Sequence, residues 1–134
     1  MISEKLVVIV DDEPGVCELL QDVFEDHGYM VRVATDGEQA LRLLSQLEAP
    51  PCVVILDLIM PVIDGGAVYR AMQADPTLSK VSIVITTSDP SRAPPGAMTM
   101  KKPVNLALLI DAVNKCCEQP VASRRATTSE PVAG

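Results

Sequence analysis

The feature that most constrains the fold is an apolar run that ends in a single carboxylate. Residues 52–56 read CVVIL and lead directly into Asp57. A run of this length, preceded by the turn-forming pair Pro50-Pro51, predicts a strand that is buried on both faces. A lone charge is costly inside a core but is natural where such a strand ends at the carboxyl edge of an open parallel sheet. We therefore expect Asp57 to lie at a sheet edge, where ligands bind.

Strand and helix patterns alternate along the rest of the chain. Further apolar or alternating runs predict strands at 6–10, 30–34, 81–86 and 98–101. Helical periodicity fills the stretches 14–27, 37–47, 65–74 and 106–113. Crossovers of about ten residues between strands imply parallel pairing with right-handed connections. The sequence thus predicts an α/β, flavodoxin-like, doubly wound fold with a five-stranded parallel sheet in the order 2-1-3-4-5.

The net charge and the length of the apolar runs limit which partners the protein can bind and where in the cell it can lie. The formal net charge is −7 over 134 residues, which argues against direct binding of nucleic acid. No apolar run approaches the roughly 18 residues that a membrane span needs, and no secretory signal is visible at the start. We expect a cytoplasmic protein without membrane contact.

The four cysteines lie within apolar periodic patterns, at positions 17, 52, 116 and 117. None has the spacing of a metal site, and His27 is the only histidine. We predict that all four are reduced thiols in the core or on helices. The pair Cys116-Cys117 is the one expected to be partly exposed, near the end of the last helix.

Acidic residues gather where the first and third strands end. In the predicted strand order these two strands are neighbours, so Asp11, Asp12 and Asp57 meet at one edge. Carboxylates that meet in a small space raise one another's pKa unless a cation relieves them. Oxygen ligands with open positions suit Mg²⁺, and Lys102 at the end of the fifth strand can reach the same place. With the hydroxyl of Thr87, this set suits formation of an acyl phosphate on Asp57.

Four motifs together resemble the receiver domain of two-component response regulators of the chemotaxis-regulator kind. They read VVIVDDEP, VVILDLIMPVIDG, IVITTS and KKPV, and the resemblance covers about residues 5 to 117. It implies that Asp57 accepts a phosphoryl group from a phosphohistidine on a sensor histidine kinase or phosphotransfer protein, as in a phosphorelay. It also implies that Thr87 and Lys102 contact the phosphoryl oxygens.

The resemblance further implies a magnesium site. Asp12, Asp57 and the backbone carbonyl of Ile59 correspond to metal ligands, and Asp11 corresponds to the residue that holds a metal-bound water. Lys102 rather than Lys101 matches the lysine of the family, because the family lysine directly precedes proline.

The chain departs from the family pattern at three places. Only fourteen residues separate Thr87 from Lys102, and several of them are prolines. Because proline ends a helix, we expect the fourth helix to be shortened or missing. Thr99 stands where the family has an aromatic switch residue, so the usual coupling through a ring is unavailable. Ile59 is apolar where the attacking water must pass, which could slow loss of the phosphoryl group.

Several functions are compatible with parts of this pattern. The first is a phosphorylation switch that turns over no outside substrate and is therefore not an enzyme in the ordinary sense. The alternative is a pseudo-receiver, a protein-interaction module that works without phosphorylation. A carboxylate-nucleophile phosphatase usually needs a second aspartate two residues after the first, where this chain has Ile59. A flavin or nucleotide binder would need a glycine-rich phosphate loop after the first strand, which the sequence lacks.

The predicted organisation is a receiver domain at 1–117 and a disordered tail or linker at 118–134. The final residues have no periodicity and are rich in Ser, Thr, Pro and Ala. No output domain follows within the sequence. Either the chain acts alone by binding a downstream protein target, which is the alternative we expect, or the intact protein continues past the tail. The oligomeric state stays open.

Overall fold

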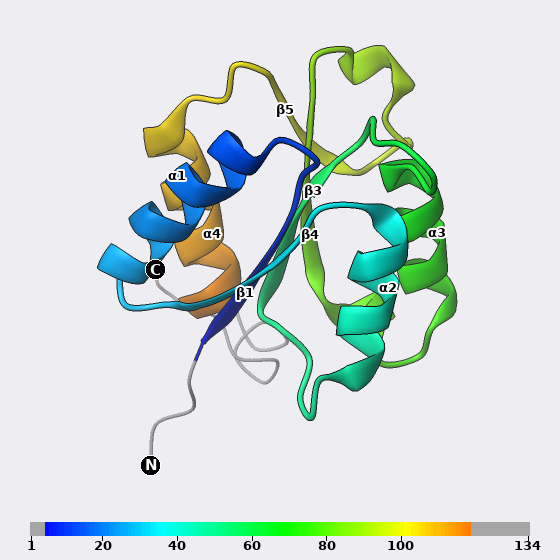
Figure 1. Ribbon diagram of the computed structural model, residues 1–134, viewed down its shortest axis with the longest axis horizontal. Coiled ribbons are helices and arrows are strands. Elements are labelled where there is room, and N and C mark those ends of the chain that lie inside the picture. Colours follow the sequence, from blue (N-terminus) through cyan, green and yellow to red (C-terminus); the bar gives the residue numbers. More distant parts are fainter. Residues whose placement is uncertain (1–4, 119–134) are drawn as a thin grey trace.

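A computed structural model describes residues 5–118, which fold around one parallel sheet (Figure 1). Its strands are β1 (Leu6–Val10), β2 (Met30–Ala34), β3 (Val53–Asp57), β4 (Ser82–Thr87) and β5 (Met98–Lys101). They lie in the order β2-β1-β3-β4-β5, and every neighbouring pair is parallel. The predicted fold class and strand order are confirmed. Strands β3 and β4 begin and end one residue later than predicted, so Asp57 is the last residue of β3.

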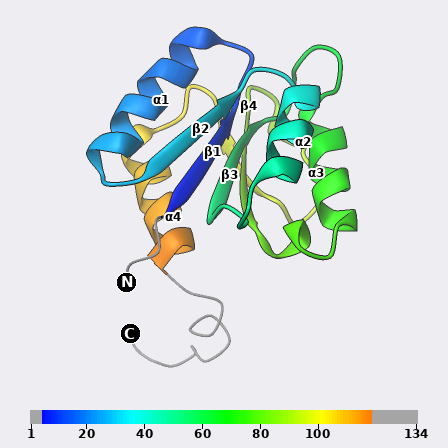
Figure 2. The same ribbon diagram turned by 60° about the horizontal axis from the view of Figure 1, so that its bottom comes forward.

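Two helices cover each face of this sheet. Helices α1 (Pro14–Asp26) and α4 (Leu106–Glu118) pack on one face, and α2 (Gly37–Gln46) and α3 (Gly65–Ala74) pack on the other (Figures 1 and 2). Alternate residues of β1 divide between two buried clusters accordingly, with Val7 and Ile9 under α1 and α4. Burial of the three central strands β1, β3 and β4 on both faces explains why they read as continuous apolar runs, whereas the edge strands β2 and β5 are partly exposed.

Side-chain caps fix where three of the helices begin. Asp36 accepts a hydrogen bond from the backbone N–H of Gln39 (2.8 Å), and Asp64 accepts one from that of Ala67 (2.9 Å). Asn105, just before α4, accepts one from the backbone N–H of Leu108 (3.0 Å). Each cap satisfies an amide that the first helical turn leaves without a partner. The cap at Asp64 matters for function because α3 begins directly after the loop that follows Asp57.

The connection between β4 and β5 contains no full helix. Its only helical element is the three-residue 3-10 helix η2 (Pro90–Arg92), and a second short one, η1 (Leu78–Lys80), precedes β4. The sequence predicts that the family's fourth helix, which would lie between β4 and β5, is shortened or missing, and this is confirmed. Pro94 and Pro95 leave no room for a longer helix there. Ala93 and Ala97 of this connection pack against the buried cluster beneath α2 and α3.

The prediction that all four cysteines are thiols is wrong for two of them. Cys52, just before β3, and Cys117, in the last turn of α4, form a disulfide across 65 residues of sequence. Helix α4 packs against β3 and brings its last turn to the amino end of that strand, so the two Cα atoms lie 5.1 Å apart. Spacing along the chain could not reveal this pairing because it depends on how α4 packs. Cys17 is a buried thiol, as expected for a core residue.

The carboxyl end of the described chain is helical. Helix α4 runs to Glu118, so the rest of the predicted tail, residues 119–134, lies outside the described residues. Within residues 5–118, every helix is too short or too polar to cross a lipid bilayer.

Candidate functional site

Three carboxylates converge at the carboxyl edge of the sheet. Asp11 and Asp12 follow β1, and Asp57 ends the neighbouring strand β3. One carboxylate oxygen from each of the three lies within 4.8 Å of the others. Asp11 and Asp57 are only 3% and 4% exposed, whereas Asp12 is open to solvent. The cluster is therefore a mostly buried acidic site with one open side.

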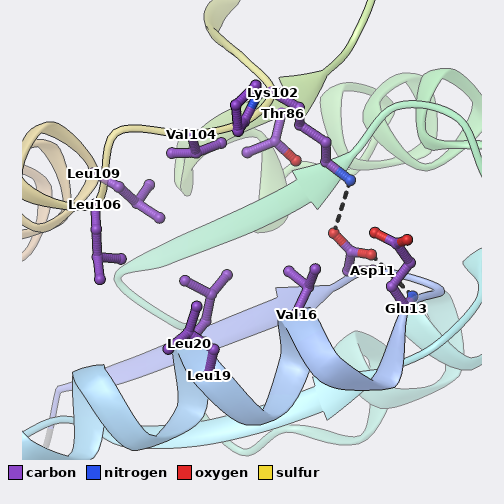
Figure 3. A pocket seen from close by; sticks show the side chains of 11 residues that line it. Asp11, Glu13, Val16, Leu19, Leu20, Thr86, Lys102, Val104, Leu106 and Leu109 are labelled. Atoms are coloured by element: carbon purple, nitrogen blue, oxygen red, sulfur yellow. Dashed lines mark hydrogen bonds and ion pairs between the residues drawn. The ribbon is translucent and has the colours of Figure 1, made fainter.

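Lys102 supplies the positive charge at this cluster. Its Nζ lies 3.1 Å from Oδ2 of Asp11 and 3.4 Å from Oδ1 of Asp57, and Figure 3 shows it directed at Asp11. The backbone N–H of Lys102 donates to the carbonyl of Thr87 (2.8 Å), which ties the residue to the end of β4. Lys101, its neighbour, is exposed. One lysine thus bridges two carboxylates that come from different strands.

Burial leaves the charges of the cluster incompletely balanced. Desolvation and the nearby charge of Asp11 raise the pKa of Asp57 to about 6, although Lys102 and the N–H of Ile59 oppose that rise. Burial alone would lower the pKa of Lys102, but its hydrogen bond to Asp11 and the two carboxylate charges outweigh burial and raise it. Because the uncompensated negative charge opposes ionisation of Asp57, binding of a further cation at this site would be electrostatically favourable.

The two threonines at the end of β4 differ in what they contact. Thr87, the predicted phosphoryl contact, is 1% exposed, and its hydroxyl accepts a hydrogen bond from the N–H of Asp89 at 3.1 Å. Thr86 pairs with Asp57 across the β3–β4 ladder and faces the cavity that Asp11 and Lys102 also line (Figure 3). The sequence interpretation did not include Thr86. The sequence carries no signal for it, because its place opposite Asp57 follows from the register between β3 and β4.

The loop after β3 holds Asp57 in place through its backbone. The N–H of Ile59 donates to Oδ1 of Asp57 (3.3 Å), so the main chain of this predicted ligand residue lies at the site. Gly65, at the start of α3, donates its N–H to the carbonyl of Leu58 (2.8 Å). A Cβ on Gly65 would lie 2.2 Å from the carbonyl oxygen of Asp57. Only glycine allows α3 to begin this close to the strand.

Val62 in the same loop carries backbone strain. Its φ is +67°, in the left-handed region, and its side chain is 83% exposed. A β-branched side chain in that region is a genuine outlier, and its cost is of the order of 1–2 kcal/mol. The strain persists because the loop must turn between Asp57 and the capped start of α3.

Val62→Gly is expected to stabilise the protein by about 1 kcal/mol, since relief of strain exceeds the added flexibility of the unfolded chain. The exposed side chain of Val62 contributes little packing that could be lost. Urea unfolding followed by circular dichroism measures the change. Val62→Ala keeps a Cβ in the left-handed region and is expected to recover less of the gain. A destabilised glycine variant would contradict this account.

An apolar cavity of about 490 Å³ adjoins the acidic cluster. Asp11, Thr86 and Lys102 line its polar end, and side chains from α1, from α4 and from the connection between β5 and α4 line most of the rest (Figure 3). The apolar lining residues are Val16, Leu19, Leu20, Pro103, Val104, Leu106 and Leu109. The site therefore combines a charged end with an apolar wall, which the sequence interpretation did not foresee.

Comparison with known proteins gives one consistent answer. A family model described as the response regulator receiver domain matches residues 7–114. The DNA-binding response regulator MtrA of Mycolicibacterium smegmatis is 38% identical over 82 residues, which are 61% of this chain and 34% of MtrA. The "Probable chemotaxis protein CheY" of Rhizobium etli is 35% identical over 94 residues, 69% of this chain and 71% of that protein. The chain thus spans about a third of the length of MtrA and most of the length of the chemotaxis protein.

Solved structures share the fold. The receiver domain of the sensor histidine kinase PA1611 from Pseudomonas aeruginosa PAO1 superposes with a TM-score of 0.76 at 21% identity. The match covers 87% of this chain and 100% of that one, which was solved with a magnesium ion coordinated in its active site cleft. The matched family model covers the strands that carry the acidic cluster and Lys102. The chain belongs to the response regulator receiver domain family, whose members take a phosphoryl group on an aspartate in two-component signalling.

Proposed function

We propose that Asp57 is the residue of this receiver that accepts the phosphoryl group, from a phosphohistidine on a sensor histidine kinase or phosphotransfer protein. The observation that carries this assignment is the position of Asp57 between Lys102 and the two other carboxylates at the strand ends. An oxygen of Asp57 attacks phosphorus, the phosphorus–nitrogen bond breaks, and the imidazole leaves with the bonding electron pair. The product is an acyl phosphate.

Each neighbouring group has a separate task in this proposal. Lys102 holds the carboxylate of Asp57 in place beforehand and then neutralises charge on the phosphoryl oxygens. The N–H of Ile59, already bonded to Asp57, fixes which carboxylate oxygen faces the donor. The hydroxyl of Thr87 turns from the backbone of Asp89 to a phosphoryl oxygen, and this change moves the loop after β4.

The acidic cluster fits a magnesium ion. Asp11, Asp12 and Asp57 offer only oxygen ligands, and the open side at Asp12 leaves coordination positions for water and phosphate. Asp12, Asp57 and the main-chain carbonyl of Ile59 are the proposed direct ligands, and Asp11 holds a metal-bound water. When bound, the ion neutralises charge that develops on the transferred group. The magnesium ion in the cleft of the PA1611 receiver supports this choice of metal.

The proposal also covers the organisation of the chain and its downstream partner. Residues 1–117 form the receiver and 118–134 a tail or linker, and the phosphorylated form binds a downstream protein target. The site modifies itself and turns over no outside substrate, so in this proposal the protein is a signalling module and not an enzyme. The proposed compartment is the cytoplasm. The net charge of −7 supports the absence of direct contact with nucleic acid. A pseudo-receiver is not favoured, because Asp57 and Lys102 are both present and in contact.

Intact mass spectrometry of the full chain tests this function. Incubation with acetyl phosphate and Mg²⁺ is expected to add the mass of one phosphoryl group, and chelation of Mg²⁺ is expected to prevent the gain. Asp57→Asn is expected to abolish it, whereas Asp111→Asn, which changes an exposed carboxylate on α4, leaves it intact. A folded wild type that gains no phosphoryl group would support the pseudo-receiver instead. Continued release of phosphate from varied small substrates would favour a phosphatase.

A further inference from the structure

The disulfide lies at the opposite end of β3 from Asp57. Cys52 immediately precedes β3, and Cys117 is the last buried residue of α4, so the bond ties the end of the last helix to the amino edge of the sheet. The first turns of the same helix line the cavity beside Lys102, through Leu106 and Leu109. Helix α4 therefore lines the cavity beside the acidic cluster at one end and carries a covalent link at the other.

The two sulfur atoms differ in how a reactant can reach them. Cys117 is only 7% exposed, whereas Cys52 is half-buried and lines a surface cavity of about 440 Å³. Prolines from two loops, Pro50, Pro51 and Pro76, form much of the wall of this cavity, and Lys80 adds a positive charge. A cation beside a disulfide favours approach of a thiolate, which is the form of a thiol that attacks sulfur. Of the two cysteines, Cys52 is therefore the more open to the surface and Cys117 the more protected.

We propose that Cys52 and Cys117 form a reversible thiol–disulfide site, reduced by a small thiol or dithiol that enters the cavity beside Lys80. A thiolate of the reductant attacks Sγ of Cys52, the bond between the two cysteines breaks, and Cys117 leaves with the electron pair and takes up a proton. A second thiolate of the reductant then attacks the mixed disulfide and releases Cys52. In sum, two cysteine thiols form and the reductant becomes a disulfide.

The consequence of reduction falls on α4. Buried side chains spaced along the helix, Leu109, Val113 and Cys117, hold it on the sheet, and the disulfide reinforces the last of these contacts. Once the bond is broken, the last turn keeps only the packing of two small side chains, Cys117 and the partly buried Cys116, and frays more readily. In a compartment that keeps thiols reduced, a disulfide of this kind is transient and serves redox sensing. This role does not depend on phosphorylation of Asp57.

The buried thiol of Cys17 takes no part in this exchange. Burial, reinforced by the charge of Asp11, raises the pKa of Cys17 to about 11, and its thiol donates to the backbone carbonyl of Asp11 (3.2 Å). At neutral pH this group carries almost no thiolate. Cys17 therefore does not attack the disulfide between Cys52 and Cys117.

Hydrogen exchange with and without reductant tests the proposal on the full chain. Protein purified without reductant is expected to show a peptide that links Cys52 to Cys117. Native-state treatment with dithiothreitol is expected to reduce the bond and to speed amide exchange in the last turn of α4 by roughly tenfold or more. Reoxidation with glutathione disulfide is expected to restore slow exchange. Cys52→Ala, or Cys52→Ser should the alanine variant fold poorly, is expected to exchange fast without reductant.

Cys116→Ala serves as the matched control, because it changes the adjacent residue of the same helix and keeps the bond. It is expected to respond to reductant as the wild type does. A linkage of Cys52 to Cys116, or no linkage at all, would overturn the proposal. So would a bond that dithiothreitol reduces only in denaturant, or a last turn whose exchange is the same in both states. None of these results bears on the mass gain at Asp57, so the two proposals fail separately.

Discussion

Gly65→Ala is expected to destabilise the receiver by about 3 kcal/mol or more. The new Cβ would lie 2.2 Å from the carbonyl oxygen of Asp57 and 2.6 Å from Cα of Leu58. Both are backbone atoms, so relief requires α3 or the end of β3 to move. A shift of α3 away from the strand end would also stretch the hydrogen bond from the N–H of residue 65 to the carbonyl of Leu58, which is 2.8 Å long with Gly65. Urea unfolding of both proteins measures the loss.

Gly66→Ala is the matched control for this substitution. A Cβ there would have the flexible end of Arg70 as its nearest neighbour, at 3.3 Å. Alanine is the better helix former, so this variant is expected to be as stable as the wild type or more stable by up to about 1 kcal/mol. Equal stability losses for the two variants would show that close packing at Asp57 is not the cause.

Any folded fraction of Gly65→Ala is also expected to take up phosphoryl groups more slowly. Movement of the strand end would displace the carboxylate of Asp57 from Lys102, which lies 3.4 Å away. Because small displacements of a reacting group reduce rates steeply, the acetyl phosphate reaction is a sensitive second measurement. Gly66→Ala is expected to react at the rate of the wild type.

Asp57→Asn is expected to stabilise the protein by about 2 kcal/mol at neutral pH in the absence of divalent cations. The folded protein holds the pKa of Asp57 at about 6, above the ordinary value of 3.8. Between these values the folded state binds more protons than the unfolded state, so wild-type stability falls as pH rises from about 4 to about 6. Above pH 6 the penalty is complete and constant. Asparagine carries no charge and escapes it, while Lys102 keeps its contact with Asp11 at 3.1 Å.

Free energies of unfolding measured from pH 4 to pH 8 check this sign. The advantage of Asp57→Asn is expected to be small at pH 4, to grow up to about pH 6 and to stay level beyond it. Added Mg²⁺ is expected to stabilise the wild type more than the variant, since the variant lacks one of the three carboxylates. Asp111→Asn, at an exposed ion pair on α4, is expected to change stability by less than about 1 kcal/mol at every pH. An advantage that does not depend on pH would contradict the assigned cause.

The local pattern of the sequence was enough to predict the elements and their order. Apolar runs such as LVVIV and VVILD form strands because a central parallel strand is buried on both faces, so no polar residue interrupts it. The caps Asp36, Asp64 and Asn105 lie at helix starts because a nearby side chain satisfies the exposed amides. Pro94 and Pro95 prevent a full helix between β4 and β5, because proline lacks a backbone N–H donor and its ring clashes with the preceding turn. All these effects act within a few residues.

The members of the acidic cluster were also predictable, because strand order alone brings Asp11, Asp12 and Asp57 to one edge. The cavity between α1 and α4 was not, since it depends on how two helices pack against each other. Nor was Thr86, whose place opposite Asp57 follows from a register that no single strand specifies.

The sequence by itself therefore determined which strands and helices form, their order in the sheet, and which charged residues reach its carboxyl edge. Only the tertiary structure decided that Lys102 bridges Asp11 and Asp57, that α3 starts against the backbone of Asp57, and that Cys52 meets Cys117. The reason is the range of the interactions involved. Periodicity and capping are written in neighbouring residues, whereas these contacts join segments whose distance is set by the packing of whole helices on the sheet.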